Sequence, residues 1–251
     1  PLFASEPEFL VALRSCAEPE AVERRAELIA LVAERQLKFL RQSTTSPKLV
    51  VFATSVSFAA AVATALHARL GAEAVVTLAR VTEGDDLGRF ERDPRALVAV
   101  LDERGEEGLN LHFADAVLHA DLPLSIRRLE QRIGRLDRFG RSKGPLKHAV
   151  VIPDGDENTP WSVWLELLRS GIEIFDRPVS DLQFVIDCVE RGIWRHLLRS
   201  GANGLDEHIA SLREVMAAER QRLDEQYALD QLAMSREPSK TLVAAMEEAE
   251  E

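Results

Sequence analysis

Cysteine is scarce in this chain of 251 residues, with Cys16 and Cys188 as its two copies. They lie far apart and belong to no CxxC or cysteine–histidine spacing, so the sequence indicates neither a disulfide framework nor a metal site. A reducing, cytoplasmic location is therefore expected. The chain begins at Pro1 without a methionine, and we expect a fragment of a longer protein or a processed product.

Positive charge is in deficit as well. Lysine and arginine number 31 against 42 aspartates and glutamates, which gives a formal net charge of -11. Binding to phosphate needs concentrated lysine and arginine, so this composition argues against a protein that grips nucleic acid by bulk electrostatics. Any contact with nucleic acid has to be local.

A phosphate loop is missing too. No string of the form G-x-x-x-x-G-K-[ST] occurs, so a self-contained ATPase is excluded. The uncharged run from Leu49 to Leu66 just reaches the length of a membrane span. Threonines and serines interrupt it, and Ser55 is placed to cap a helix after a strand, so we predict a strand and a helix there and no membrane contact.

Short apolar runs alternate with helical patterns from residue 48 to residue 152, which predicts an α/β fold with a parallel sheet sandwiched by helices. Their continuous apolar character is typical of strands buried on both faces. The strands are expected at 48–53, 73–78, 96–101, 115–120 and 147–152, with helices at 5–42, 56–70, 86–93 and 125–137. An all-helical part is expected to follow at 160–170, 180–200 and 206–233, where Gly171 and Gly201 are the predicted helix ends and Thr159 the cap of the first helix.

The most informative segment is DLPLSIRRLEQRIGRLDRFGR, residues 121–141. On a helical wheel, we assign Ile126, Leu129, Ile133 and Leu136 to a buried face, and Arg128, Gln131, Arg132, Arg135 and Arg138 to the opposite face. The stretch 127–143 carries a charge of +5, which leaves -16 for the remainder. Gly134 costs a helix interior about 1 kcal/mol relative to alanine, so another body is expected to approach there. A basic helix that simply faces solvent is the alternative interpretation.

The string QRIGRLDRFGR resembles the sixth motif of superfamily-two helicases in its Swi/Snf-related form. DERGEEGLNLHFADAVLHADLP (102–123) is similar to the fifth motif and KLVVFATS (48–55) to the fourth, in the family's order. The helical part to about residue 230 is similar, more weakly, to the RapA group of bacterial RNA-polymerase-associated ATPases. The resemblance implies a RecA-like second motor lobe at 46–155. It also implies a helical lead-in from a missing first lobe at 1–45, a helical extension at 156–234 and an acidic tail at 235–251.

The resemblance also implies roles for single residues. Arg135 and Arg138 would reach the terminal phosphates of ATP, with Arg138 as the arginine finger, and an arginine fork suits phosphoryl oxygens. Gln131 and Gly108 would also lie at the nucleotide. Contacts to nucleic acid would come from Thr54, Ser55, Gly105 and Asn110. The sequence departs from the family's pattern at Asp102, Glu106 and Glu107, because acids that face a phosphate backbone weaken its binding.

Two functions remain open at this point. The first is an ATP-driven translocase of double-stranded nucleic acid, expected to be DNA, in which ATP and Mg²⁺ bind mainly to the missing first lobe and this lobe is inactive alone. The second is a protein-interaction module that docks on RNA polymerase or on a phage-defence complex through its helical part, which the acidic balance and the tryptophans favour.

Overall fold

The computed structural model describes residues 18–78, 85–105, 108–137, 144–152, 159–200 and 203–234. It divides the chain into two compact units, Pro1–Leu165 and Glu166–Glu251. The expected limits of the lead-in, at residue 45, and of the helical extension, at residue 156, stay predictions. Each unit is described by itself below.

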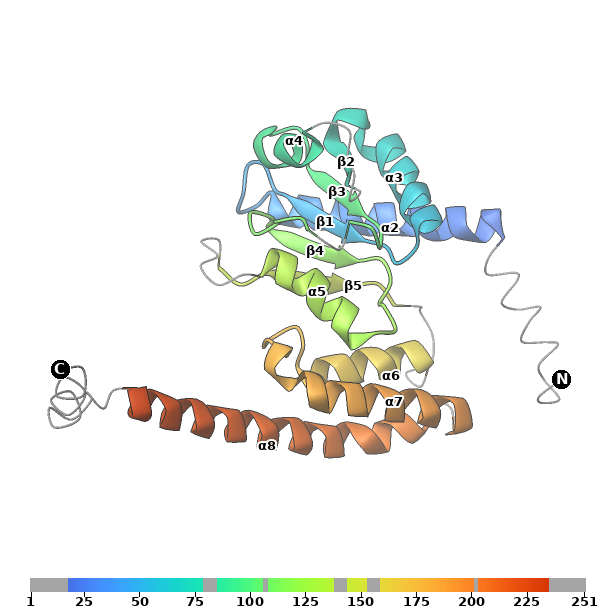
Figure 1. Cartoon of the computed structure of the whole chain (residues 1–251). Coiled ribbons are helices and arrows are strands. Elements are labelled where there is room, and N and C mark those ends of the chain that lie inside the picture. The colour runs from blue at the N-terminus through green and yellow to red at the C-terminus, as the bar shows by residue number, and fades with distance from the viewer. Residues whose placement is uncertain are drawn as a thin grey trace, which may run out of the picture. The chain divides into compact units, whose positions relative to one another are not determined.

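A five-stranded parallel sheet forms the centre of the first unit (Figure 1). Its strands are β1 (Leu49–Phe52), β2 (Val75–Leu78), β3 (Val98–Leu101), β4 (Ala116–His119) and β5 (Lys147–Val150). They lie in the order β2-β3-β1-β4-β5, so β1 is central and pairs in parallel with both β3 and β4. The predicted α/β class and the five predicted strands are therefore confirmed.

Side chains alternate along the central strand between two apolar clusters. Leu49 and Val51 pack with α2 (Pro19–Leu40) and α3 (Val56–Leu70) on one face. Val50 and Phe52 belong to the cluster on the other face, which includes residues of α4 (Asp86–Arg92) and α5 (Ile126–Leu136). The short 3₁₀ turn η1 (Ala72–Ala74) leads into β2. The sheet is thus buried on both faces, which explains its continuous apolar strands.

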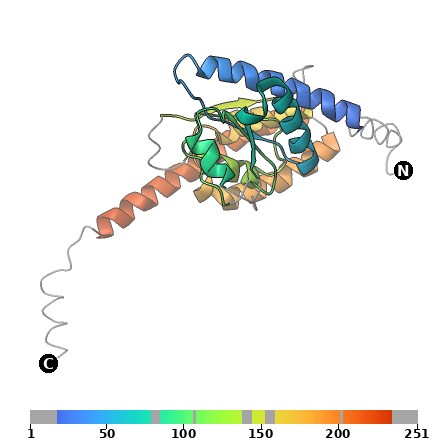
Figure 2. The same ribbon diagram turned by 90° about the horizontal axis from the view of Figure 1, so that it is seen from above.

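Helix α2 belongs to this core. It lies along α3 in Figures 1 and 2, and its apolar stripe is fully covered. The buried residues of that stripe are Ala26, Ile29, Ala30, Ala33, Leu37 and Leu40. Residues 19–40 therefore complete one face of the α/β layer.

Two predicted caps are confirmed. The Ser55 hydroxyl accepts a hydrogen bond from the Phe58 N–H at 3.3 Å and so starts α3. The Thr159 hydroxyl accepts one from the Ser162 N–H at 3.1 Å at the start of α6 (Pro160–Glu166). The uncharged run 49–66 is divided between β1 and α3, and no described helix is both long and apolar enough to cross a bilayer.

The second unit is helical. It contains a π-helical segment η2 (Leu167–Ile172), a 3₁₀ turn η3 (Ser180–Leu182), α7 (Gln183–Ser200) and α8 (Asn203–Met234). Gly171 does not end a helix as predicted, because it is buried inside η2 with a Leu212 methyl 3.2 Å from where its Cβ would be. The segment ends at Glu173, whose φ is 60°. Gly201 lies outside the described residues.

Candidate functional site

Arg132 is the side chain around which the candidate site is built. It lies on α5 with none of its surface exposed, although the helical wheel assigned it to the polar face. That assignment was wrong. Arg132 follows Leu129 by three positions and precedes Leu136 by four, so helical geometry places it on the same buried face as both leucines. Ile133, which was expected to be buried, is half-buried.

The guanidinium of Arg132 reaches the ends of two strands. Its Nη2 donates to the Thr54 hydroxyl at 3.1 Å, and its Nη1 donates to the Asp121 carbonyl oxygen at 3.1 Å. The Asp121 carboxylate lies 3.9 Å from Nη1. Thr54 follows β1 and Asp121 follows β4, so the contacts lie at the carboxyl edge of the sheet, where ligands of open α/β folds bind.

Asp121 closes the network on Thr54. Its Oδ1 accepts hydrogen bonds from the Thr54 backbone N–H at 2.8 Å and from the Thr54 hydroxyl at 2.5 Å. The hydroxyl proton is therefore committed to Asp121 in this structure. If Thr54 contacts nucleic acid as predicted, donating this proton to a phosphate would require breaking the bond to Asp121. The exposed Ser55 next to it is better placed for such a contact.

Aromatic rings lie next to the guanidinium of Arg132. The guanidinium carbon lies 5.2 Å from the centre of the Phe52 ring, close enough for a cation–π interaction. His119 stacks on Phe52 and on His148, with ring centres 6.2 Å and 5.9 Å apart. Burial holds the pKa of His119 well below its ordinary value, and the charges of Arg132 and His148 lower it further. His119 is therefore neutral near pH 7, so it adds no second positive charge beside the guanidinium.

The loop after β3 is organised by Asp102. Its Oδ1 accepts hydrogen bonds from the N–H groups of Arg104 at 2.8 Å and Gly105 at 3.2 Å. The carboxylate of Asp102 also lies 3.4 Å from the Arg104 side chain. Asp102 is thus buried and neutralised within its own loop, so it presents little charge to a phosphate. Glu106 and Glu107 lie outside the described residues.

Glycine is required at two positions of this loop for different structural reasons. A Cβ on Gly105 would lie 2.6 Å from the Leu78 carbonyl oxygen at the end of β2, so packing against that backbone alone requires glycine. Gly108 has a φ of +83° and no described atom within 4 Å of a Cβ, so its conformation requires glycine. Their predicted contacts with nucleic acid and nucleotide, respectively, stay predictions.

Further along the loop, the Asn110 side-chain oxygen lies 2.8 Å from His112 Nδ1, so this side chain ties the loop to itself. The Leu111 N–H then donates to the Arg135 carbonyl oxygen at 2.9 Å. The loop that resembles the fifth motif is therefore bonded to the helix that resembles the sixth. The role of Asn110 in binding nucleic acid stays a prediction.

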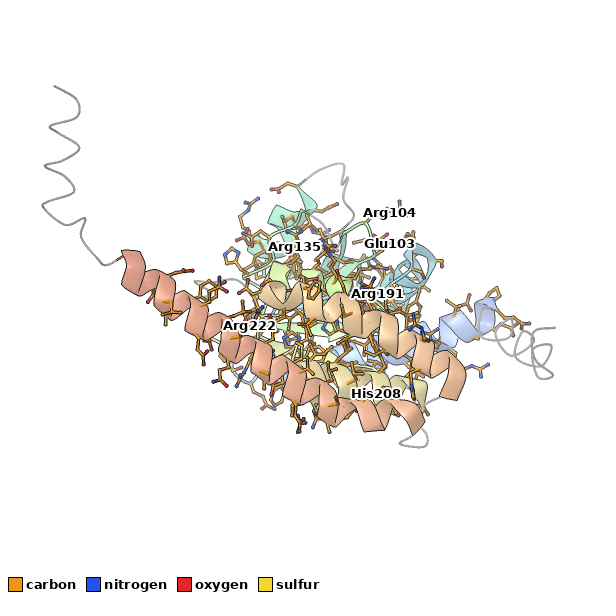
Figure 3. All side chains as sticks on the ribbon, turned by 60° about the horizontal axis from the view of Figure 1, so that its bottom comes forward. Glu103, Arg104, Arg135, Arg191, His208 and Arg222 are labelled. Carbon is orange, nitrogen blue, oxygen red and sulfur yellow. The ribbon has the colours of Figure 1, made fainter. Side chains whose placement is uncertain are left out.

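The predicted nucleotide contacts on α5 are accessible where the structure describes them. Gln131 is exposed and Arg135 is half-buried, and Figure 3 shows Arg135 on its helix. Arg128 lies within 4.0 Å of Glu103, in the loop after β3. Arg138, the predicted finger, lies outside the described residues. A Cβ on Gly134 would meet no described atom within 4 Å, so nothing described in this chain makes the expected close approach there.

Sequence reasoning missed Arg132, Asp121 and His119 as parts of the site. The signal for Arg132 was its spacing from Leu129 and Leu136. Asp121 and His119 carried a weaker signal, because both stand at the end of the strand predicted at 115–120. Among the described residues, no group of three His, Cys, Asp or Glu side chains is arranged to hold a metal ion.

Comparison with known proteins identifies the domain. The family model described as "Helicase conserved C-terminal domain" matches residues 31–140. This match covers 110 of the 251 residues of the chain. The match begins within α2 and ends just after α5, and so contains the whole Arg132 network. The expectation of a RecA-like second lobe is confirmed.

The relatives of this helicase domain include two bacterial proteins. The RNA polymerase-associated protein RapA of Cronobacter sakazakii is 34% identical over 99 residues, and that of Klebsiella pneumoniae is 35% identical over 99 residues. Each match covers 39% of this chain and 10% of the relative. The chain therefore spans about a tenth of the length of these curated relatives.

Two solved structures are also similar. One is the Sulfolobus solfataricus SWI2/SNF2 ATPase core in complex with dsDNA, with 21% identity, a TM-score of 0.41, and coverage of 56% of this chain and 30% of that chain. The other is Mss116p DEAD-box helicase domain 2 bound to an RNA duplex, with 19% identity and a TM-score of 0.41. This match covers 85% of this chain and 92% of that chain.

Proposed function

We propose that this chain is the second motor lobe of an ATP-dependent translocase of double-stranded nucleic acid, in a protein whose first lobe holds ATP and Mg²⁺. The proposal rests on how α5 is anchored in the lobe and on which of its side chains are exposed. One face of this helix is anchored to the carboxyl edge of the sheet through Arg132, while Gln131 is exposed and Arg135 is half-buried. Such a helix can present guanidinium groups to a separate body.

Arg135 and Arg138 would act on ATP when the two lobes close. Charge develops on the phosphoryl oxygens during transfer, and arginines that reach them at closure stabilise that charge. The chain has no phosphate loop of its own, so it supplies these arginines and little else to the nucleotide. Alone, it should hydrolyse almost no ATP.

Nucleic acid would contact the carboxyl edge of the sheet locally. The exposed Ser55 at the N-terminus of α3 offers a hydroxyl, and the first turn of α3 favours an anion. Thr54, Gly105 and Asn110 would shape the surface around that contact. Because the chain carries a net charge of -11, we expect few phosphate contacts and a shallow dependence of duplex affinity on salt.

The test compares single substitutions in protein that carries both lobes. Arg135→Ala and Arg138→Ala should each lower the duplex-stimulated kcat for ATP by about 10³-fold or more. Arg127→Ala is the matched control, because Arg127 is an exposed arginine of the same helix. ATPase of both finger variants at the level of the control would reject the proposal.

A second candidate function is a protein-interaction module, with RNA polymerase or a defence complex as the partner. It is favoured by large apolar side chains on the surface of the second unit, where Phe184 is 84% exposed, Tyr227 53% and Leu229 66%. Binding to duplex DNA that does not respond to salt, together with capture of purified RNA polymerase by residues 160–234, would favour this function. In this proposal, as in the first, the protein acts in the cytoplasm.

A further inference from the structure

Arg132 joins three separate pieces of the first unit. Among its contacts are Thr54 after β1, the Asp121 backbone and carboxylate after β4, and the Phe52 ring on β1. The guanidinium itself belongs to α5. Strand β1 is distant in sequence from β4 and α5, and all three meet at one buried charge, so none of them can shift without changing the surroundings of Arg132.

The same face of α5 carries two further attachments. Arg128 and Arg135 are four positions before and three positions after Arg132, so the three side chains share that face. Arg128 approaches Glu103 in the loop after β3, and the Arg135 carbonyl oxygen accepts from the Leu111 N–H further along the same loop. Arg132 is the fully buried member of this row, and it therefore fixes the rotation of α5 about its axis.

The geometry of the Arg132 site is specific to a guanidinium. Two of its nitrogens donate in different directions, to the Thr54 hydroxyl and to the Asp121 carbonyl oxygen, while its plane faces Phe52. A lysine at this position would keep the charge but could not reproduce that fork. A glutamine would leave the partly buried acceptors of Thr54 and Asp121 without their charged donor, which is costly.

We propose that Arg132 is a positioning residue that couples the duplex-contacting edge of this lobe to the orientation of Arg135. The inference rests on the proposed motor function. A duplex that contacts the β1–α3 junction displaces Thr54 and Asp121, and Arg132 passes this displacement to α5. Stimulation of ATP hydrolysis by duplex is the expected result, and this stimulation needs the intact network as well as the arginines that reach ATP.

The experiment measures ATPase against ATP concentration, with and without saturating duplex DNA, in protein that carries both lobes. Arg132→Gln should lower the duplex-stimulated kcat about tenfold or more, because displacement of a catalytic group by about 1 Å can cost 10²-fold. The KM for ATP should change by less than about threefold, because ground-state binding by the first lobe is retained. Arg132→Lys should lie between wild type and Arg132→Gln, and Arg127→Gln should match wild type.

Asp121→Asn gives a second, nearly isosteric test if Arg132→Gln does not fold. The amide keeps an acceptor for the Thr54 N–H but removes the negative charge near Arg132. We expect reduced duplex stimulation and faster hydrogen exchange of the Thr54 amide. In the double variant Asp121→Asn with Arg132→Lys, the fold loss of duplex-stimulated kcat should be smaller than the product of the two single fold losses, because both changes break one network.

Two outcomes separate this inference from the proposed function. If Arg135→Ala abolishes ATPase while Arg132→Gln and Asp121→Asn, both folded by circular dichroism, keep the duplex stimulation of Arg127→Gln, the coupling role is refuted and the motor function stands. If Arg135→Ala also leaves ATPase intact, the proposed function fails, and the coupling inference fails with it.

Discussion

Gly134 provides a prediction in which stability and function should change in opposite directions. It lies inside α5 and is exposed, and an added Cβ would meet no described atom within 4 Å. Gly134→Ala therefore removes the conformational entropy cost of a helical glycine without a clash. We expect the free energy of unfolding of the chain to rise by up to about 1 kcal/mol.

Thermal unfolding followed by circular dichroism measures this gain. For a chain of this size, 1 kcal/mol corresponds to an increase in Tm of about 2–4 °C. Gly105→Ala is the matched comparison, because its Cβ would lie 2.6 Å from the Leu78 carbonyl oxygen. Such overpacking should lower the free energy of unfolding by about 1–3 kcal/mol.

The functional half of the prediction concerns protein with both lobes. If the other lobe approaches α5 at Gly134, the added methyl group should reduce duplex-stimulated ATPase although the lobe itself is more stable. A fall in Tm for Gly134→Ala would refute the structural reasoning, because it would mean that the position is packed. A higher Tm with unchanged ATPase would refute the close approach.

Three further predictions concern buried polar side chains. Because burial lowers the pKa of His119, the unfolded chain binds a proton below pH 6.5 that the folded chain does not. As the pH is lowered below 6.5, the free energy of unfolding measured by chemical denaturation should therefore decrease by about 1.4 kcal/mol per pH unit. His119→Phe should make this dependence on pH shallower. Lys48→Met should destabilise the chain by about 2 kcal/mol or more, because the buried Lys48 ammonium group donates to two backbone carbonyl oxygens at 2.7 Å each. A loss under 0.5 kcal/mol in the same assay would contradict this estimate, which takes about 1 kcal/mol per hydrogen bond. Trp164→Phe should cost about 1 kcal/mol, because the indole N–H donates to the Pro123 carbonyl oxygen at 3.3 Å. Fluorescence-monitored unfolding in urea measures this loss, and an unchanged midpoint would refute it.

The sheet could be predicted from the sequence because buried parallel strands leave continuous apolar runs. Helix α3 was placed to the residue, since Ser55 gives it a capping hydroxyl. Sequence spacing also located α5. These features are local, so a single segment contains the information that specifies them.

The missed features depend on contacts between segments that are distant in sequence. Arg132 was assigned to the polar face of α5 by the helical wheel, because its partner Thr54 is 78 residues away and could not be seen in the local pattern. Gly105 also packs against a distant segment, at the Leu78 carbonyl oxygen, and its predicted contact with nucleic acid stays a prediction. Asp102 is an exception, because its partners Arg104 and Gly105 belong to its own loop. Gly171 was predicted to end a helix, but packing against Leu212 places it inside one.

The role of Arg135 in stabilising charge on the transferring phosphoryl group is tested most directly by binding of a transition-state analogue. Protein with both lobes should bind ADP–aluminium fluoride with Mg²⁺ at least about tenfold more weakly after Arg135→Ala, because the proposed contact of Arg135 with the phosphoryl group acts in the transition state. Affinity for ATP itself should fall by less than about threefold. Equal losses for the two ligands, or no loss for either, would contradict the proposed role.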